Sequence, residues 1–292
     1  MTTEVSPINT ANFADMAHAM GMGADMSSGS SKSSTLPRLR IWNSAIMGQV
    51  EVNGKKKNME VVPEGTFRLQ MPDDSFVYAE QANVRIFVQR FMNKRFDEKN
   101  NMYVKTIMGE DLNSDLKDNA GTFNCGKPAG YIPNYSDYSK EQQAFFKTIK
   151  RTRVILGEVE LVNPVNAEGN EVEVDRQPFI WEVDNGEAFK AMGEPFTQLG
   201  RQKRLPVQHW IKCTTTTGQY SGNVTYYVPV PSLDLSSTID LEEADQKRFQ
   251  DFIDWIGNYN QYILNAYNEK AGNAISDDDA SLVEEFVDID EE

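Results

Sequence analysis

Residues 82–96 read ANVRIFVQRFMNKRF, and this stretch predicts the longest strand of the chain. It contains no Pro or Gly and is rich in Val, Ile and Phe, the residues that favour strands. Alternate side chains of an extended chain share a face. We therefore expect an apolar face built from Ala82, Val84, Ile86 and Val88. The opposite face would interleave aromatic, cationic and amide groups, namely Arg85, Phe87, Gln89, Phe91, Asn93 and Arg95.

Further strands are predicted on both sides of this stretch. Residues 102–108 would pair with it across a polar turn at 97–101, and the Asn53-Gly54 pair predicts a tight hairpin. Polar and Gly/Pro-containing segments separate the other apolar runs. These further predicted strands are 39–41, 46–52, 59–61, 67–69, 151–162, 172–174, 179–183, 207–214 and 224–230.

Three helices are predicted among these strands. Ser139-Lys140-Glu141-Gln142 matches a capping box and opens a short helix reaching about residue 150. A second helix begins near Asn185, and Gly193 and Pro195 should kink or shorten it. The longest covers about 240–268, where large apolar side chains recur every three or four residues on one face.

This order of elements predicts a mainly β protein with α-helices. We expect an OB-type antiparallel β-barrel with insertions, a long C-terminal amphipathic helix and flexible termini. The pattern leaves open whether residues 37–108 and 151–230 form one barrel or two units. The predicted parts are a flexible N-terminal arm at 1–35, a core at 36–236, a C-terminal helix at 237–271 and a disordered acidic tail at 272–292.

The net charge of −15 is unevenly distributed. Residues 277–292 contain nine acidic and no basic residues, whereas basic residues cluster in the body, as at Lys55-Lys56-Lys57. A body that contains basic clusters, joined to an acidic tail, is able to bind a polyanion and to regulate that binding. The overall charge therefore does not argue against a nucleic-acid partner.

Several classes of protein are not supported by the sequence. No apolar run approaches the roughly 18 residues of a membrane helix. The chain has two Cys and no recognisable signal sequence, which predicts a reducing cytoplasm. This would be the cytoplasm of the host cell if the chain is phage-encoded. The four Cys and His residues lack the close pairs of a zinc site, and nucleotide-loop and nucleophile-elbow motifs are missing. Paired acids at Glu158/Glu160 and Glu171/Glu173 are interpreted as a solvent face. We expect a non-enzymatic protein without metal or cofactor.

Cationic and aromatic residues that alternate along strands suggest binding of a single nucleic-acid strand. Bases stack on aromatic rings while cations follow the phosphates. The alternative is that the aromatic residues are buried and the cations merely solvated, and Trp181 in particular is expected in the core. The candidate phosphate contacts are Arg85, Lys94, Arg95, Lys105, Lys150, Arg151, Arg153 and Lys212. The candidate stacking residues are Phe87, Phe91, Tyr103 and Trp210.

The acidic tail also contains apolar residues, such as Leu282, Phe286 and Ile289. Apolar anchors set among acids suit a peptide that docks on a partner with a basic rim, although a purely solubilising tail is the alternative. The candidate partner-binding residues are Asp277, Asp278, Asp279, Glu284, Glu285, Phe286, Asp288, Asp290, Glu291 and Glu292.

The layout resembles that of the single-stranded-DNA-binding, helix-destabilising proteins of T-even and T-odd tailed phages. The similarity covers roughly residues 121–230 and the tail, including Cys125-Gly126-Lys127-Pro128-Ala129-Gly130-Tyr131-Ile132, the basic segment 147–156, the loop 163–173 and the segment 179–183. It implies an OB fold with a basic, aromatic-lined cleft for DNA and an acidic tail that recruits replication enzymes. The T-even core carries zinc, whose Cys and His ligands are missing here apart from Cys125.

The sequence thus predicts a protein that coats single-stranded DNA during phage DNA replication, recombination and repair. Its acidic tail would compete for the DNA cleft and recruit a polymerase, helicase or primase. Phe13, Met16, Ala17 and Met20 have helical spacing and leave self-association open. One alternative is a phage virion or assembly protein. A second is an RNA-binding OB module, because nothing in the sequence separates RNA from DNA.

Overall fold

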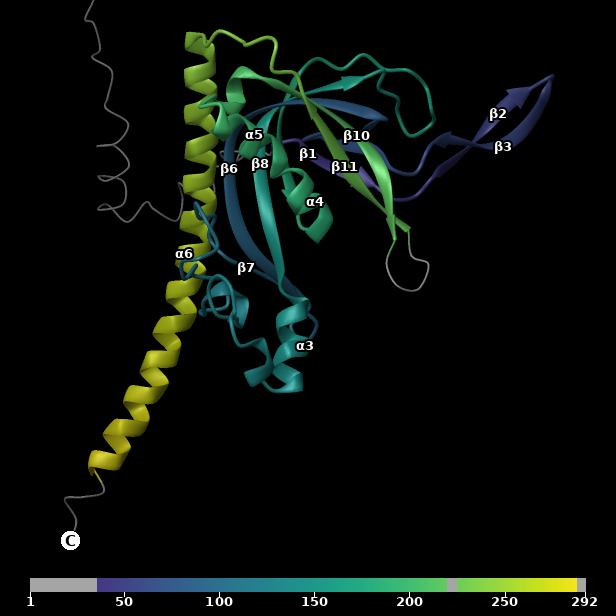
Figure 1. Ribbon diagram of the computed structural model, residues 1–292. Helices are drawn as coiled ribbons and strands as arrows, with labels where there is room; N and C mark the ends of the chain where they lie inside the picture. Colours follow the sequence, from purple (N-terminus) through teal and green to yellow (C-terminus); the bar gives the residue numbers. More distant parts are fainter. Residues whose placement is uncertain (1–35, 220–224, 288–292) are drawn as a thin grey trace, which may run out of the picture. The chain divides into compact units, whose positions relative to one another are not determined.

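The structure is a computed structural model (Figure 1). It describes the backbone of residues 36–219 and 225–287. Side chains are described within these ranges as far as residue 271, apart from Val52 and Gln219. Contacts divide the chain between Leu36 and Pro37, and all the elements below belong to the unit that starts at Pro37. The predicted N-terminal arm at 1–35 lies outside the described residues.

Strands β6 (Gln81–Asp97) and β8 (Lys150–Val162) form the central antiparallel pair. The 17 residues of β6 confirm the long strand predicted at 82–96. A β-bulge at Phe87 shifts the register between Ile86 and Val88. Gly157 lies opposite the bulge, where an added Cβ would clash with the carbonyl oxygen of Arg85. Because a bulge adds one residue, the side-chain alternation of β6 reverses after Phe87.

One nine-stranded sheet contains strands from both halves of the chain, in the order β11-β10-β6-β8-β9-β1-β4-β5, with β7 paired to β6. Residues 37–108 and 151–230 therefore contribute to a single sheet. The neighbours of the central pair are β7 (Met102–Lys105), β9 (Gln177–Val183), β10 (Trp210–Gln219) and β11 (Thr225–Leu233), with β1 (Arg38–Trp42), β4 (Thr66–Gln70) and β5 (Phe76–Ala79) completing the sheet. The edge strand β11 places Pro229 opposite Thr215 and Pro231 opposite Cys213.

The sheet curls, but its two ends are not paired as strands. Residues of β4 and β11 share one hydrophobic core, to which Phe67 and Val228 belong. Thr215 Oγ1 donates to the carbonyl oxygen of Gly65 at 2.7 Å, and the Tyr227 hydroxyl donates to Glu64 Oε1 at 2.7 Å. Side chains thus connect β10 and β11 to the turn before β4, where no β-ladder forms between the described strands. The mainly β prediction is confirmed, whereas the closed OB barrel is not.

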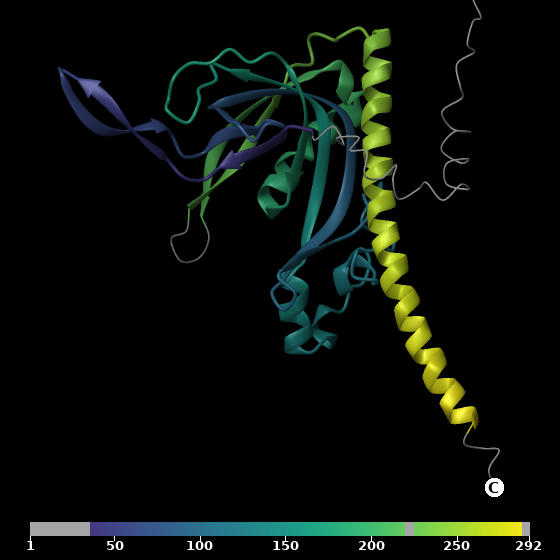
Figure 2. The same ribbon diagram turned by 180° about the vertical axis from the view of Figure 1, so that it is seen from behind.

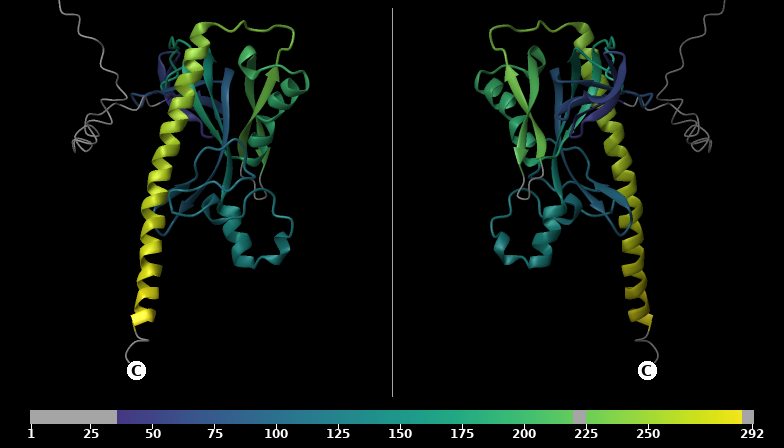
Figure 3. Two further views of the ribbon diagram at one scale, coloured as in Figure 1. Left: turned by 90° about the vertical axis from the view of Figure 1, so that its left-hand side faces the viewer. Right: turned by 90° about the vertical axis from the view of Figure 1, so that its right-hand side faces the viewer.

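Helices cover both faces of this sheet (Figure 3). The short helices α4 (Gly186–Ala191) and α5 (Glu194–Arg201) lie on the core face, where Ala188 and Met192 join the hydrophobic core. The predicted interruption is confirmed, because Gly193 precedes α5 and Pro195 lies in its first turn. Helix α6 (Glu243–Val287) lies against the opposite face and packs Phe252 against Phe87.

Helix α6 continues well past the predicted end near residue 268. Asn260 fixes its middle by accepting from the backbone N–H of Met108 at 2.7 Å and donating to the Met108 carbonyl oxygen at 3.1 Å. The helical backbone extends through 277–287, which belong to the stretch predicted as a disordered tail. Residues 288–292 lie outside the described range.

A separate two-stranded ribbon projects beyond the main sheet (Figure 2). Its strands are β2 (Ile46–Val52) and β3 (Lys55–Val62), joined by Asn53 and Gly54 with φ of 54° and 74°. Two positive φ values are those of the type I′ turn that an Asn-Gly pair favours. The predicted hairpin is confirmed.

The remaining helical elements of the described residues are α3 (Lys140–Thr148) and three single turns. The predicted capping box is present, with Ser139 accepting from the N–H of Gln142. The strand predicted at 172–174 is wrong, because the loop folds back and Val172 donates its N–H to Pro164. The turns are η1 (Asn124–Gly126), η2 (Tyr135–Asp137) and η3 (Pro206–Gln208). None of the helices among the described residues has the length and apolar character needed to cross a membrane.

Candidate functional site

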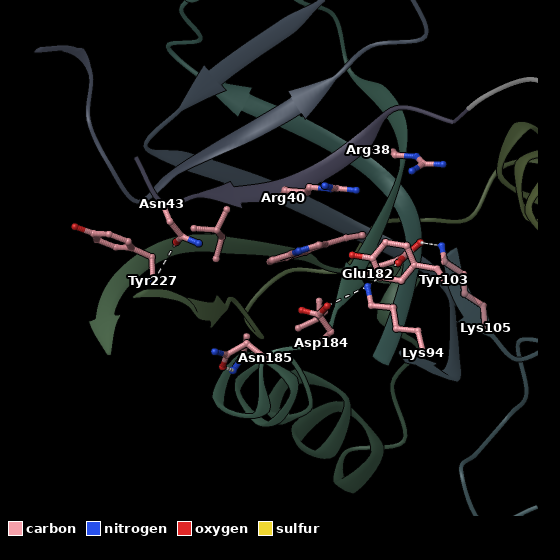
Figure 4. A pocket seen from close by; sticks show the side chains of 14 residues that line it. Arg38, Arg40, Asn43, Lys94, Tyr103, Lys105, Glu182, Asp184, Asn185 and Tyr227 are labelled. Atoms are coloured by element: carbon pink, nitrogen blue, oxygen red, sulfur yellow. Dashed lines mark hydrogen bonds and ion pairs between the residues drawn. The ribbon is translucent and has the colours of Figure 1, made fainter. Parts of the chain in front are cut away.

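A cleft opens where strands β1 and β9 diverge. The two strands pair in parallel at Arg38 and Ile180. Beyond that point they separate around a cavity of about 460 Å³ (Figure 4). Four cationic side chains, two tyrosines and two carboxylates are among its lining residues. These are Arg38, Arg40, Lys94, Lys105, Tyr103, Tyr227, Glu182 and Asp184.

Ion pairs hold the lysines of the cleft. Lys94 Nζ lies 2.8 Å from Glu182 Oε2 and 3.0 Å from Asp184 Oδ2, and Lys105 Nζ lies 3.8 Å from Glu182 Oε1. Burial opposes the charge of Lys94, but the two carboxylates outweigh it and raise the pKa of the amine. Burial likewise opposes ionisation of Glu182, yet Lys94 and Lys105 lower its pKa. Lys94 and Glu182 are therefore both charged at neutral pH.

The arginines of the cleft are exposed instead. Within the described part of the chain, neither Arg38 nor Arg40 has an ion-pair partner. Burial lowers the pKa of Lys105, and the nearby charges of Lys94, Arg38 and Arg40 lower it further. Four cations thus face two carboxylates, and the excess positive charge favours an anion at the two arginines.

A row of lysines extends the cleft across three strands. Lys94 of β6 lies opposite Lys105 of β7 on one side and opposite Lys150 of β8 on the other. Directly opposed residues in antiparallel strands share a face. Lys150 is exposed and carries no ion pair within the described residues.

Two exposed aromatic rings lie beside this row. Phe96 and Tyr103 are opposed across β6 and β7, with ring centroids 5.2 Å apart. Phe96 is 44% exposed and Tyr103 is 55% exposed, which is high for large rings. They offer flat apolar surfaces next to cations.

The same face continues on β1, β4 and β5. Arg40 lies opposite Arg68. The guanidinium of Arg68 lies 4.1 Å from the ring centroid of Trp42 and 4.7 Å from that of Phe76. Burial lowers the pKa of Arg68. The cationic–aromatic band is defined here as Phe96, Tyr103, Lys105, Lys94, Lys150, Arg38, Arg40, Trp42, Arg68 and Phe76.

Of the predicted site residues, the band brings together Lys94, Tyr103, Lys105 and Lys150. The face predicted for 85–95 is wrong, because the bulge at Phe87 divides it. Phe87 packs against Phe252 of α6 on one side of the sheet, whereas Phe91 packs against Phe189 of α4 on the other.

Arg85 is buried in an ion-pair cluster beneath α6. Its Nη1 and Nη2 donate to the two oxygens of Asp245 at 2.7 and 2.8 Å, and Nη1 lies 3.4 Å from Glu158. Glu158 also pairs with Arg248. Glu158 was expected on a solvent face and is instead buried, because two arginines compensate its charge.

Arg153 is also buried, among aromatic rings. Its guanidinium lies 5.1, 4.6 and 5.7 Å from the ring centroids of Phe91, Phe189 and Phe196. Burial lowers its pKa to about 10. A guanidinium stacked among rings is a stable arrangement in itself, so Arg153 is held by the fold and does not reach the band.

The other predicted residues are dispersed. Arg95 donates its Nε–H to the carbonyl oxygen of Cys125 at 3.2 Å, and Arg151 is exposed 6.0 Å from the Phe189 ring. Trp210 lies under the guanidinium of Arg176 at 4.7 Å, and Lys212 is exposed on the same strand. Trp181 is buried in the core, as predicted.

Sequence reasoning missed Arg38, Arg40, Trp42, Arg68 and Phe76. Residues 38–42 read RLRIW, in which cations and a ring alternate with Leu and Ile, and this period of two was a usable signal. Phe96 was counted in a strand but not as a stacking residue.

The predicted partner-binding residues remain a prediction. Those from 277 to 286 lie in the part of α6 whose side chains are not described, and those from 288 to 292 lie outside the described range. Among the described residues, His, Cys, Asp and Glu side chains form no group of three suited to a metal ion.

Comparison of the chain with protein-family models, with curated proteins and with solved structures finds no match in any of the three.

Proposed function

We propose that this chain is a non-enzymatic single-stranded-DNA-binding protein and that the cationic–aromatic band is its DNA site. The observation that carries the proposal is a pair of exposed arginines, Arg38 and Arg40, which form no ion pair within the described residues. They lie on the same sheet face as the exposed rings of Phe96 and Tyr103. Cations that neutralise phosphates and rings that stack bases are the two components of a single-strand site.

The parts of the band have separate roles in this proposal. Arg38 and Arg40 donate to phosphate oxygens, and the planar guanidinium suits two such bonds. Tyr103 and Phe96 stack unpaired bases. Lys94 and Lys105, tied to Glu182, set the positive potential of the cleft, and Lys105 Nζ lies 5.9 Å from the ring centroid of Tyr103. A site of this kind contacts the backbone and ring faces, so it binds many sequences.

The curled sheet and the acidic tail also have roles in the proposed function. The curled sheet with its side-chain bridges is an open variant of the OB barrel, whose strand face binds single strands. The acidic tail competes with DNA for the band and, once displaced, recruits a replication enzyme with a basic surface. In this role the protein coats single strands during phage DNA replication, recombination and repair.

A salt titration tests the proposal. Full-length protein is titrated with fluorescent single-stranded DNA, duplex DNA and single-stranded RNA at several salt concentrations. Each phosphate contact on a single strand contributes about 0.7 to the slope of log affinity against log salt. The double variant R38Q/R40Q should therefore have a slope lower by about 1.4 and weaker binding at low salt.

The matched control is R201Q/K203Q, which removes two exposed cations at the end of α5. It should retain the slope of the unchanged chain, and a chain ending at Ser276 should bind more tightly. Absence of binding to every oligonucleotide at low salt would overturn the proposal. Tighter binding of RNA would reassign the substrate and leave the site in place.

A further inference from the structure

The β2–β3 ribbon has two chemically different faces. Its strands are in register from Val52↔Lys55 to Met47↔Glu60, and opposed residues share a face. One face carries Val50, Lys55, Lys57 and Met59. The other carries Met47, Gln49, Glu51, Lys56, Asn58 and Glu60.

The first face, called here the basic ribbon face, contains two lysines and no carboxylate. The opposite face has one lysine and two glutamates. Within the described residues, Lys55, Lys56 and Lys57 take part in no ion pair. In a chain with a net charge of −15, this is an unbalanced positive surface at the tip of a projecting arm.

The basic ribbon face is also apolar. Val50 is 37% exposed and Met59 is 44% exposed. A two-stranded ribbon in water is only marginally stable on its own. Its root is nevertheless well packed, because an added Cβ at Gly169 in the neighbouring loop would lie 2.7 Å from Val61. The arm is therefore anchored at its base and presents apolar and cationic groups together at its tip.

The ribbon is continuous with the band along the chain. It is inserted between β1, which carries Arg38, Arg40 and Trp42, and β4, which carries Arg68. A strand of nucleic acid that crosses the band at β1 therefore passes the root of the ribbon.

We propose that the basic ribbon face binds a second segment of the same single-stranded DNA, with Lys55 and Lys57 at phosphates and Val50 and Met59 against bases. This inference rests on the proposed function. Charge complementarity selects the occupant, because the face combines apolar side chains with two cations that no described carboxylate pairs, and the face itself lacks any acid. The ribbon acts as an arm that lengthens the site beyond the main sheet.

The test uses full-length protein with two oligothymidylates, of about 5 and about 30 nucleotides. One OB fold covers roughly 4–16 nucleotides. The shorter strand lies near the lower end of this range, and the longer strand is well above it. The variant K55Q/K57Q removes both cations of the basic ribbon face. The control K56Q/K247Q removes one lysine from the opposite face of the same tip and one exposed lysine of α6. Equal thermal unfolding midpoints would show that all three chains fold alike.

The inference predicts that K55Q/K57Q weakens binding of the longer strand and leaves that of the shorter strand unchanged. The loss of two phosphate contacts lowers the slope of log affinity against log salt by about 1.4. The ratio of the affinity of the unchanged chain to that of K55Q/K57Q should therefore decrease about sevenfold between about 50 and 200 mM salt. The control should retain most of the affinity and slope for the longer strand.

The outcomes that overturn the inference differ from those that overturn the proposed function. If the unchanged chain binds both strands and K55Q/K57Q behaves like the control, the ribbon proposal fails and the band stands. If the unchanged chain binds neither strand, both fail. A peptide of residues 277–292 serves as a further probe. Binding of this peptide that K55Q/K57Q abolishes, with unchanged DNA affinity, would assign the face to the acidic tail instead.

Discussion

Two arginine sites on the same sheet face have opposite surroundings. Arg85 on β6 lies beneath α6 and meets both oxygens of Asp245 and one of Glu158. Arg40 on β1 lies beyond the helix, is exposed and has no ion-pair partner within the described residues. The comparison shows that alternation along a strand identifies the face of a cation, whereas the element packed above decides whether the cation stabilises the fold or remains available to a ligand.

The largest expected effect comes from removing Arg85. R85Q leaves Asp245 and Glu158 with less compensation under α6, and removing one partner of a buried pair costs about 3–5 kcal/mol. R40Q removes an exposed side chain and should change the free energy of unfolding by less than about 0.5 kcal/mol. Chemical denaturation of both variants measures the difference. Equal stabilities would break the contrast between the two sites.

A smaller effect is expected for the aromatic part of the band. Y103A removes one stacking surface and should weaken single-strand binding by about 1–3 kcal/mol. F249A is the matched control, because Phe249 is a similarly exposed ring on α6, away from the band. Fluorescence titration of both variants would show a loss for Y103A alone. A similar loss in F249A would place the stacking surface elsewhere.

The smallest expected effect is on the stability of the fold at acidic pH. Hydrogen bonds from Arg85 lower the pKa of Asp245, against the opposing effect of burial. A carboxyl whose pKa is lower in the folded state contributes stability above its unfolded value near 3.8, and this contribution disappears as pH falls through the folded pKa. The thermal unfolding midpoint should therefore decrease when the pH is lowered below about 4. In R85Q this part of the acid dependence should be weaker, and an unchanged profile would contradict the role of the pair.

Local patterns predicted much of the fold. The run of Val, Ile and Phe at 82–96, the Asn53-Gly54 turn and the Ser139 capping box all correspond to observed elements. Each depends on neighbours in the sequence. The bulge at Phe87 depends on close backbone approach at Gly157, which is 70 residues away in the sequence. It could not be inferred from alternation and it divided the predicted face.

The candidate site was harder to predict for the same reason. Lys94, Tyr103 and Lys105 were identified because they lie on neighbouring strands joined by a short turn. Arg38 and Arg40 reach them through a parallel contact between β1 and β9, which joins residues far apart in the chain. The covering of Arg85 by α6 likewise depends on Asp245, a contact that no local pattern indicates.

The prolines of β11 bear on how copies of this protein can assemble. Pro229 and Pro231 alternate along an edge strand and are paired with β10 on one side. Proline has no N–H, so it is tolerated where that group would point away from the partner strand. Another strand approaching this edge would find two donors missing. The prolines therefore protect the exposed edge against the addition of further β-strands and against fibrous aggregation. A high local concentration of this protein is then compatible with chains that remain dispersed.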